Sequence, residues 1–85
     1  MSYIDLDFYG EIVDGEVVCE DGPLSIAFTE AGADVKVAKA VDIGQCIVAT
    51  LEGTREQLAI FLEYYCYGDK EDAAFFLEES YEDLN

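Results

Sequence analysis

The amino-acid sequence predicts an α+β fold, in which an antiparallel sheet of four to five strands packs against two C-terminal helices. Three observations lead to this prediction. Apolar and polar residues alternate over residues 3–13, the turn dipeptide Asp14-Gly15 follows at once, and after Gly53 the apolar spacing changes from two residues to 3.6. Strands followed by helices are typical of α+β proteins. A chain of 85 residues has room for one such domain, which we expect to span residues 1–85.

The first hairpin is the strongest local prediction. The Asp-Gly dipeptide favours a two-residue type I′ turn, because both of its residues tolerate a positive φ. A loop of that length pairs Val13 with Glu16 and Ile12 with Val17. Ile12 and Val17 are then expected on the core face. Gly10 lies inside the first strand and indicates a bulge or a sharp twist.

Three further strands are expected after the hairpin, each separated from the next by a turn. The first has Leu24, Ile26 and Phe28 on its core face, the second begins at residues 35–37, and the third covers residues 46–51. Because the strands follow one another along the chain, we expect them to form a meander.

Two helices are expected after the strands. Thr54, with Gln57 three residues later, is a capping-box pattern that marks the start of the first helix, and Gly68 is placed to end it. Asp69 is expected to cap the second helix, where acids in the first turn suit the helix dipole. The apolar stripe of this second helix consists of Ala73, Phe76, Leu77 and Leu84.

The chain is strongly acidic. Twenty Asp and Glu stand against four Lys and Arg, with no His, so that the formal net charge is −16. Residues 1–22 contain seven acids and no base, and residues 69–85 contain seven acids and one base. Charge of this sign favours a basic partner and excludes attraction to nucleic acid or to an anionic membrane. Five Phe and six Tyr exclude a disordered acidic tail.

Catalytic and metal-binding motifs are not found in the sequence. Without histidine the commonest general base is missing, and no serine or cysteine has a partner base. The acids around Asp5 and those at residues 69–72 do not have the spacing of a calcium-binding EF-hand loop. We therefore expect a protein that is not an enzyme and that has no cofactor and no metal.

The cysteines favour a reducing compartment. Cys19, Cys46 and Cys66 are odd in number, lack metal-site spacing and lie in apolar surroundings, where a free cysteine behaves as a small hydrophobe. No secretory signal and no membrane-spanning run is visible. We expect a cytoplasmic protein, located in the host cytoplasm if a phage encodes it.

The outer faces of the first hairpin and the last helix are the predicted partner-binding surface. Carboxylates two residues apart on a strand are separated by roughly 6.6 Å, which resembles two phosphate steps of about 3.4 Å along one DNA strand. Interleaved tyrosines would add contact area. Simple solvation also explains the alternation, although ordinary surfaces mix both charges. The predicted partner-binding residues are Tyr3, Asp5, Asp7, Tyr9, Glu11, Glu16, Glu20, Glu71, Glu78, Glu79, Glu82 and Asp83.

Several aromatic residues fall outside the apolar stripes of the two helices. Some of them should therefore be exposed, which suggests a contact surface and leaves both a monomer and a homodimer open. They are Tyr64, Tyr67, Phe75 and Tyr81. By contrast, Phe61 and Tyr65 lie on a stripe and are expected in the core.

In size, acidity and lack of catalytic residues, the whole chain resembles the small DNA-mimic inhibitors of phages and mobile elements, among them anti-CRISPR and anti-restriction proteins. The resemblance lies in composition, without a shared motif. It implies a non-enzymatic inhibitor that binds the basic nucleic-acid-binding surface of an enzyme or complex, either by occupying its DNA-binding groove or by locking a conformation. The alternatives are an immunity protein or antitoxin against a basic nuclease toxin, a halophile domain, and a structural adaptor subunit.

Overall fold

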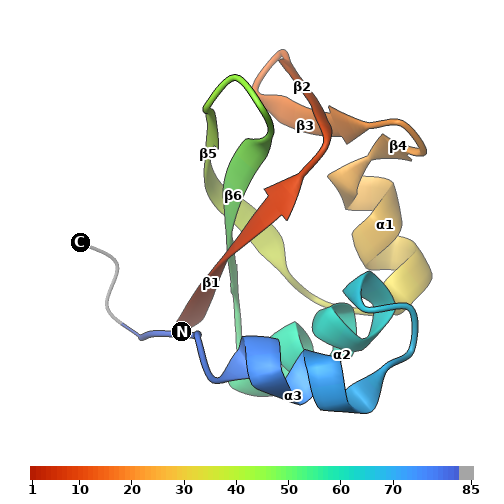
Figure 1. Cartoon of the computed structure of the whole chain (residues 1–85), viewed down its shortest axis with the longest axis vertical. Helices are drawn as coiled ribbons and strands as arrows, with labels where there is room; N and C mark the ends of the chain where they lie inside the picture. The colour runs from red at the N-terminus through yellow and green to blue at the C-terminus, as the bar shows by residue number, and fades with distance from the viewer. Residues whose placement is uncertain (83–85) are drawn as a thin grey trace.

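The computed structural model describes residues 1–82 and confirms the α+β class. The predicted single sheet of four to five strands is wrong, because the strands of these residues form two three-stranded antiparallel sheets (Figure 1). The first sheet has the order β1 (Ser2–Phe8), β6 (Ile47–Gly53), β5 (Lys36–Asp42), and the second has the order β2 (Gly10–Val13), β3 (Glu16–Cys19), β4 (Gly22–Pro23). The helices of the same residues are α1 (Leu24–Ala31), α2 (Arg55–Tyr65) and α3 (Lys70–Leu77).

The first sheet forms because its middle strand is buried. Strand β1 pairs with β6 from Ser2 opposite Gly53 to Phe8 opposite Ile47, and not with the strand that follows it in sequence. Ile47 and Leu51 of β6 are fully buried. A strand with so little exposed surface needs a partner on each side, and β1 and β5 supply them.

The predicted hairpin forms with the predicted register, in the second sheet. Asp14 has a φ of 52° and Gly15 a φ of 81°, as a type I′ turn requires, and Val13 faces Glu16. The long first strand is interrupted, however, because the chain leaves the first sheet at Tyr9. A Cβ atom on Gly10 would lie 2.1 Å from the carbonyl oxygen of Val18. Glycine therefore allows β3 to approach β2 this closely.

The predicted third strand is wrong, since residues 24–31 form helix α1. Leu24 and Phe28 are buried as expected, but Ile26 is 50% exposed. Two residues four apart share a face in a strand and in a helix alike, so this pair could not distinguish the two. Gly32 ends the helix with a φ of 71°. Because α1 lies between strands, the helices are not confined to the C-terminal part.

The N-terminal caps of α2 and α3 are confirmed. The Thr54 side chain accepts a hydrogen bond from the Gln57 N–H at 3.2 Å. The Gln57 side chain accepts from the Asp34 N–H at 2.8 Å, and so joins the start of α2 to the segment before β5. The Asp69 carboxylate accepts hydrogen bonds from the backbone N–H groups of Glu71 and Asp72, in the first turn of α3.

Helix α3 is shorter than the predicted second helix. It ends at Leu77, and Leu84 of the predicted stripe lies outside the described residues. Tyr81 instead pairs with Tyr3 through two backbone hydrogen bonds of 2.7 and 2.9 Å, and their rings stack at 5.9 Å. At the other end of β1, the Tyr65 hydroxyl donates to the Asp7 carbonyl at 2.8 Å. These contacts satisfy backbone groups on the free edge of the first sheet, which would otherwise be open to another strand.

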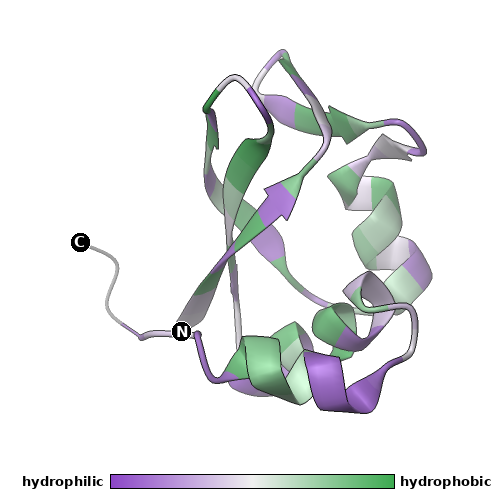
Figure 2. Cartoon of the chain, viewed as in Figure 1, coloured by the Kyte–Doolittle hydropathy of each residue, from purple (hydrophilic) through white to green (hydrophobic). Residues whose placement is uncertain are grey.

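The core lies between the first sheet and the helices, with Phe61 of α2 at its centre. Phe61 is 1% exposed, and its ring lies 5.1 Å from the Phe28 ring and 6.5 Å from the Phe8 ring. Figure 2 shows hydrophobic residues along much of β6 and α1. No helix in residues 1–82 has both the length and the apolar character needed to cross a membrane.

Candidate partner-binding surface

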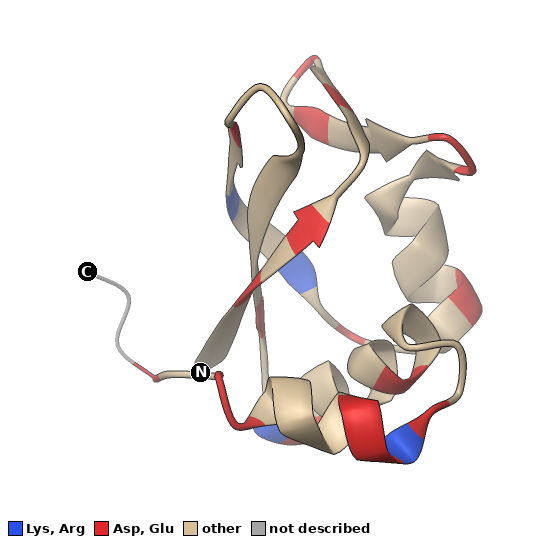
Figure 3. Ribbon diagram, in the orientation of Figure 1, with Lys and Arg blue, Asp and Glu red and all other residues tan. Residues whose placement is uncertain are grey.

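Nearly all the acidic side chains are on the surface. Every Asp and Glu of residues 1–82 is exposed except Glu52 and Glu63, which are half-buried. Among these residues one ion pair occurs, between the Lys36 Nζ and the Glu52 Oε1 at 3.0 Å. Figure 3 shows the acids spread over strands, turns and helix ends. The described acids therefore keep most of their charge uncompensated.

The outer face of the first sheet carries both charges. Tyr3, Glu52 and Lys36 form one row across the three strands. Asp5, Thr50 and Lys39 form the next row. The sequence placed Asp5 on a hairpin face without a base. That expectation is wrong because β1 pairs with β6 instead of β2, and β5, which holds two of the four bases, lies on the other side of β6.

Asp5 also has a structural role. Its Oδ1 accepts hydrogen bonds from the Thr50 hydroxyl at 2.6 Å and from the Tyr81 hydroxyl at 2.9 Å. Thr50 is buried beneath this cluster. Asp5 thus holds the segment after α3 against the sheet, and its substitution would disturb the fold as well as the charge.

Other predicted residues lie on separate elements. Glu11 and Glu16 share the outer face of the second sheet with Val13 and Val18, and Glu16 accepts a hydrogen bond from the Ser25 hydroxyl at 2.7 Å. Glu20 lies in the turn after β3. The hairpin face predicted to be continuous from Tyr3 to Glu20 is therefore divided between two sheets.

The C-terminal acids do not form the predicted helical line. Glu71 is in the first turn of α3 and Glu78 is its C-cap, whereas Glu79 and Glu82 follow the helix. Asp83 lies outside the described residues. Within the described part of the chain, no three metal-ligating side chains are arranged to hold an ion.

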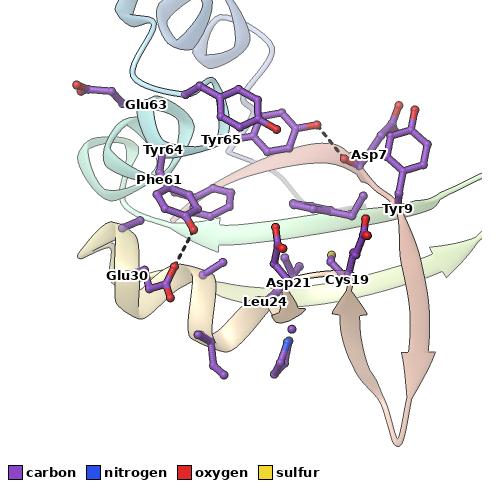
Figure 4. A pocket seen from close by; sticks show the side chains of 18 of the residues that line it. Asp7, Tyr9, Cys19, Asp21, Leu24, Glu30, Phe61, Glu63, Tyr64 and Tyr65 are labelled. Carbon is purple, nitrogen blue, oxygen red and sulfur yellow. Dashed lines mark hydrogen bonds between the residues drawn. The ribbon is translucent and has the colours of Figure 1, made fainter.

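An open groove of about 1100 Å³ brings together acids from distant parts of the chain (Figure 4). The end of β1, the turn between β3 and β4, helix α1 and helix α2 form its walls. Three residues of the predicted surface line it, namely Asp7, Tyr9 and Glu20, and no Lys or Arg does. The further acids along the groove are Asp21, Glu30 and Glu63.

Tyrosines join and border the groove walls. The Tyr64 hydroxyl of α2 donates to Glu30 of α1 at 2.9 Å. Tyr9 is 77% exposed and Tyr67, which has a φ of 55°, is 100% exposed. The expected exposure of Tyr64 and Tyr67 is confirmed. Their place outside the apolar stripe was the sequence feature that pointed to the α2 wall of this groove. The sequence did not place Glu30 there, because Glu30 lines the groove as part of helix α1 and a strand was expected in this region.

The cysteine thiols are held in their neutral form. Burial, assisted by nearby carboxylates, raises the pKa of Cys19, Cys46 and Cys66 above the usual range. A raised pKa lowers the thiolate fraction at neutral pH, and the thiolate is the reactive form. All three are half-buried and unbridged, and Cys19 and Cys66 pack against the core, as expected of small hydrophobes.

We expect the protein to lose stability in alkaline solution. The hydrogen bond to Glu30 raises the pKa of Tyr64, and burial raises the pKa of Tyr65 and Tyr81. Folding therefore favours the protonated groups, and this contribution is complete below the unfolded pKa values of about 8.5 for Cys and about 10 for Tyr. It is lost as the pH rises through the higher folded values. The urea concentration at the midpoint of unfolding should fall as the pH is raised from about 8 to about 11. It should fall less steeply for the variant Tyr64→Phe. A midpoint that stays constant over this range would contradict the prediction.

Comparison of the chain with protein-family models, with curated proteins and with solved structures finds no match. The functional argument therefore depends on the charge, the exposure and the groove of this chain alone.

Proposed function

We propose that the protein is a non-enzymatic inhibitor that binds the basic nucleic-acid-binding surface of a target protein, as the DNA mimics of phage counter-defence do, anti-CRISPR proteins among them. One observation carries this proposal: almost all the carboxylates of residues 1–82 are exposed, and among them only that of Glu52 forms an ion pair. A surface of this kind attracts a Lys- and Arg-rich site and speeds association with it.

The position of the acids matters at physiological ionic strength. The Debye length there is about 8 Å, shorter than the smallest extent of the molecule, 22 Å. A target therefore responds mainly to the face that it meets. The outer face of the first sheet carries Lys36 and Lys39, whereas Glu11 and Glu16 on the second sheet face no base across their strands. We therefore propose the second sheet and the adjoining groove, rather than the whole of β1, as the inhibitory surface.

The test is capture of a binding protein by the tagged protein, followed by displacement with duplex DNA. We expect a nucleic-acid-binding protein that the DNA releases, with an association rate that falls as salt increases. Replacing Glu11 and Glu16 by Lys should slow association by about tenfold or more, while the same change at Glu56 and Asp34, which are exposed elsewhere, should have a much smaller effect.

Three results would overturn this proposal. A captured protein that duplex DNA does not release would exclude mimicry of nucleic acid. Capture of a small basic nuclease toxin would identify an immunity protein instead. A domain that folds only in molar salt would show that its charge is an adaptation to a saline environment.

A further inference from the structure

We infer that the groove between α1, α2 and the β3–β4 turn binds an arginine-bearing segment of the target protein, with the guanidinium group between the tyrosine rings and the carboxylates. The inference depends on the proposed function for the nature of the partner, a basic protein. The inference adds two points to that function: the site at which one segment of the partner binds, and the type of side chain that this site recognises.

The groove combines an apolar floor with an acidic border. Its floor includes Leu24 and Phe61, which belong to the core, and Ile26 and Ile60, which are exposed. Exposed apolar side chains that line a concave surface and are rimmed by polar residues mark an interaction site. Since no base lines the groove, charge complementarity selects a cationic partner that also offers an apolar side chain.

The tyrosines and acids favour arginine over lysine. A guanidinium is planar, so it stacks on an aromatic ring and at the same time donates two parallel hydrogen bonds to a carboxylate. Tyr67 and Tyr9 leave their rings exposed at the groove. Figure 4 shows Asp21 pointing into the groove toward the side of α2 that carries Tyr64 and Tyr65, whereas Glu63 points away.

The groove is held open before a partner arrives. Tyr64 of α2 is bonded to Glu30 of α1, and Tyr65 of α2 is bonded to the backbone of Asp7 at the end of β1. These two bonds join three of the elements that form the walls. A site whose walls are already fixed loses less conformational freedom on binding.

The open groove has room for a peptide segment as well as for a small molecule. Its volume of about 1100 Å³ exceeds the roughly 300–1000 Å³ of most small-molecule sites. A polyamine such as spermine is the competing cation, but it has no planar group for the tyrosine rings and no apolar side chain for the floor.

The test is an NMR titration of the protein with a capped peptide of sequence Leu-Arg-Leu-Arg-Leu. We expect shifts confined to residues of the groove, among them Asp21, Glu30 and Tyr67, and weaker binding of the peptide with Lys in place of Arg. The variant Asp21→Asn with Glu30→Gln should bind about 5- to 10-fold more weakly. The matched variant Asp34→Asn with Glu56→Gln, which removes two exposed charges outside the groove, should stay within about twofold. Tyr67→Ala should weaken binding of the arginine peptide more than of the lysine peptide.

Several results would overturn the inference. Shifts spread over the whole surface, or equal weakening by the two double variants, would show unspecific attraction. Equal affinity for spermine at the same residues would identify a polyamine site. The inference and the proposed function can fail separately. If the groove variant captures the target as well as the wild-type protein does, and duplex DNA still releases that target, only the role of the groove is excluded. If the groove binds the arginine peptide but no captured protein is released by DNA, only the mimicry is excluded.

Discussion

Replacement of Phe61 by alanine is expected to cost about 3–5 kcal/mol of unfolding free energy. The side chain is 1% exposed and contacts the rings of Phe8, Phe28 and Tyr65, so its removal leaves a cavity that three different elements surround. Domains of this size are stable by roughly 5–15 kcal/mol, and repulsion among the acids places this one at the lower end. The variant should therefore be partly unfolded without denaturant.

Urea unfolding followed by circular dichroism measures this loss, and Phe75→Ala is the matched control. Phe75 lies on α3 and is 66% exposed, so the same chemical change there should alter the unfolding free energy by no more than about 0.5 kcal/mol. Equal losses in the two variants would show that Phe61 is not the centre of the core. Phe61 also lies in the floor of the groove beside Tyr64 and Tyr65, so the groove depends on the same packing as the fold.

Replacement of Gly10 by alanine is expected to cost about 3 kcal/mol, at the upper end for overpacking. The added Cβ would lie 2.1 Å from the Val18 carbonyl oxygen and 2.8 Å from the Cys19 Cα. Both are backbone atoms of β3, so the strands must separate to make room. Because residues 19–23 form one wall of the groove, we also expect the variant to bind the arginine peptide less well than its remaining folded fraction predicts.

Gly15→Ala separates this close approach from ordinary backbone strain. Gly15 has a φ of 81° but no atom within 4 Å of the position of a Cβ, so alanine there should cost only about 1–2 kcal/mol. Urea midpoints of the two variants can be compared directly, since both lie in the same hairpin. A smaller loss for Gly10→Ala than for Gly15→Ala would contradict the proposed contact with β3.

The sequence predicted those parts of the fold that depend on neighbouring residues. The turn at Asp14-Gly15, the pairing of Val13 with Glu16 and the caps at Thr54 and Asp69 are each decided within about four residues, by backbone conformation or by one short hydrogen bond. Leu24 and Phe28 were correctly expected in the core. Their spacing of four does not distinguish a strand from a helix, and the surrounding residues were therefore assigned to the wrong element.

The sequence by itself determined the α+β class, the acidity and the exposure of Tyr64 and Tyr67 outside the helical stripe, although Tyr81, expected in the same group, is half-buried. Only the tertiary structure decided which acids lie together. Strand β1 pairs with β6, 39 to 51 residues away along the chain, because β6 is largely buried and its backbone groups need a hydrogen-bonding partner on each edge. As a result Asp5 lies in a row with Thr50 and Lys39, while Asp7 and Glu20 reach the groove. Local patterns specify turns and caps, whereas strand partners and the sites between elements follow from burial of the whole chain.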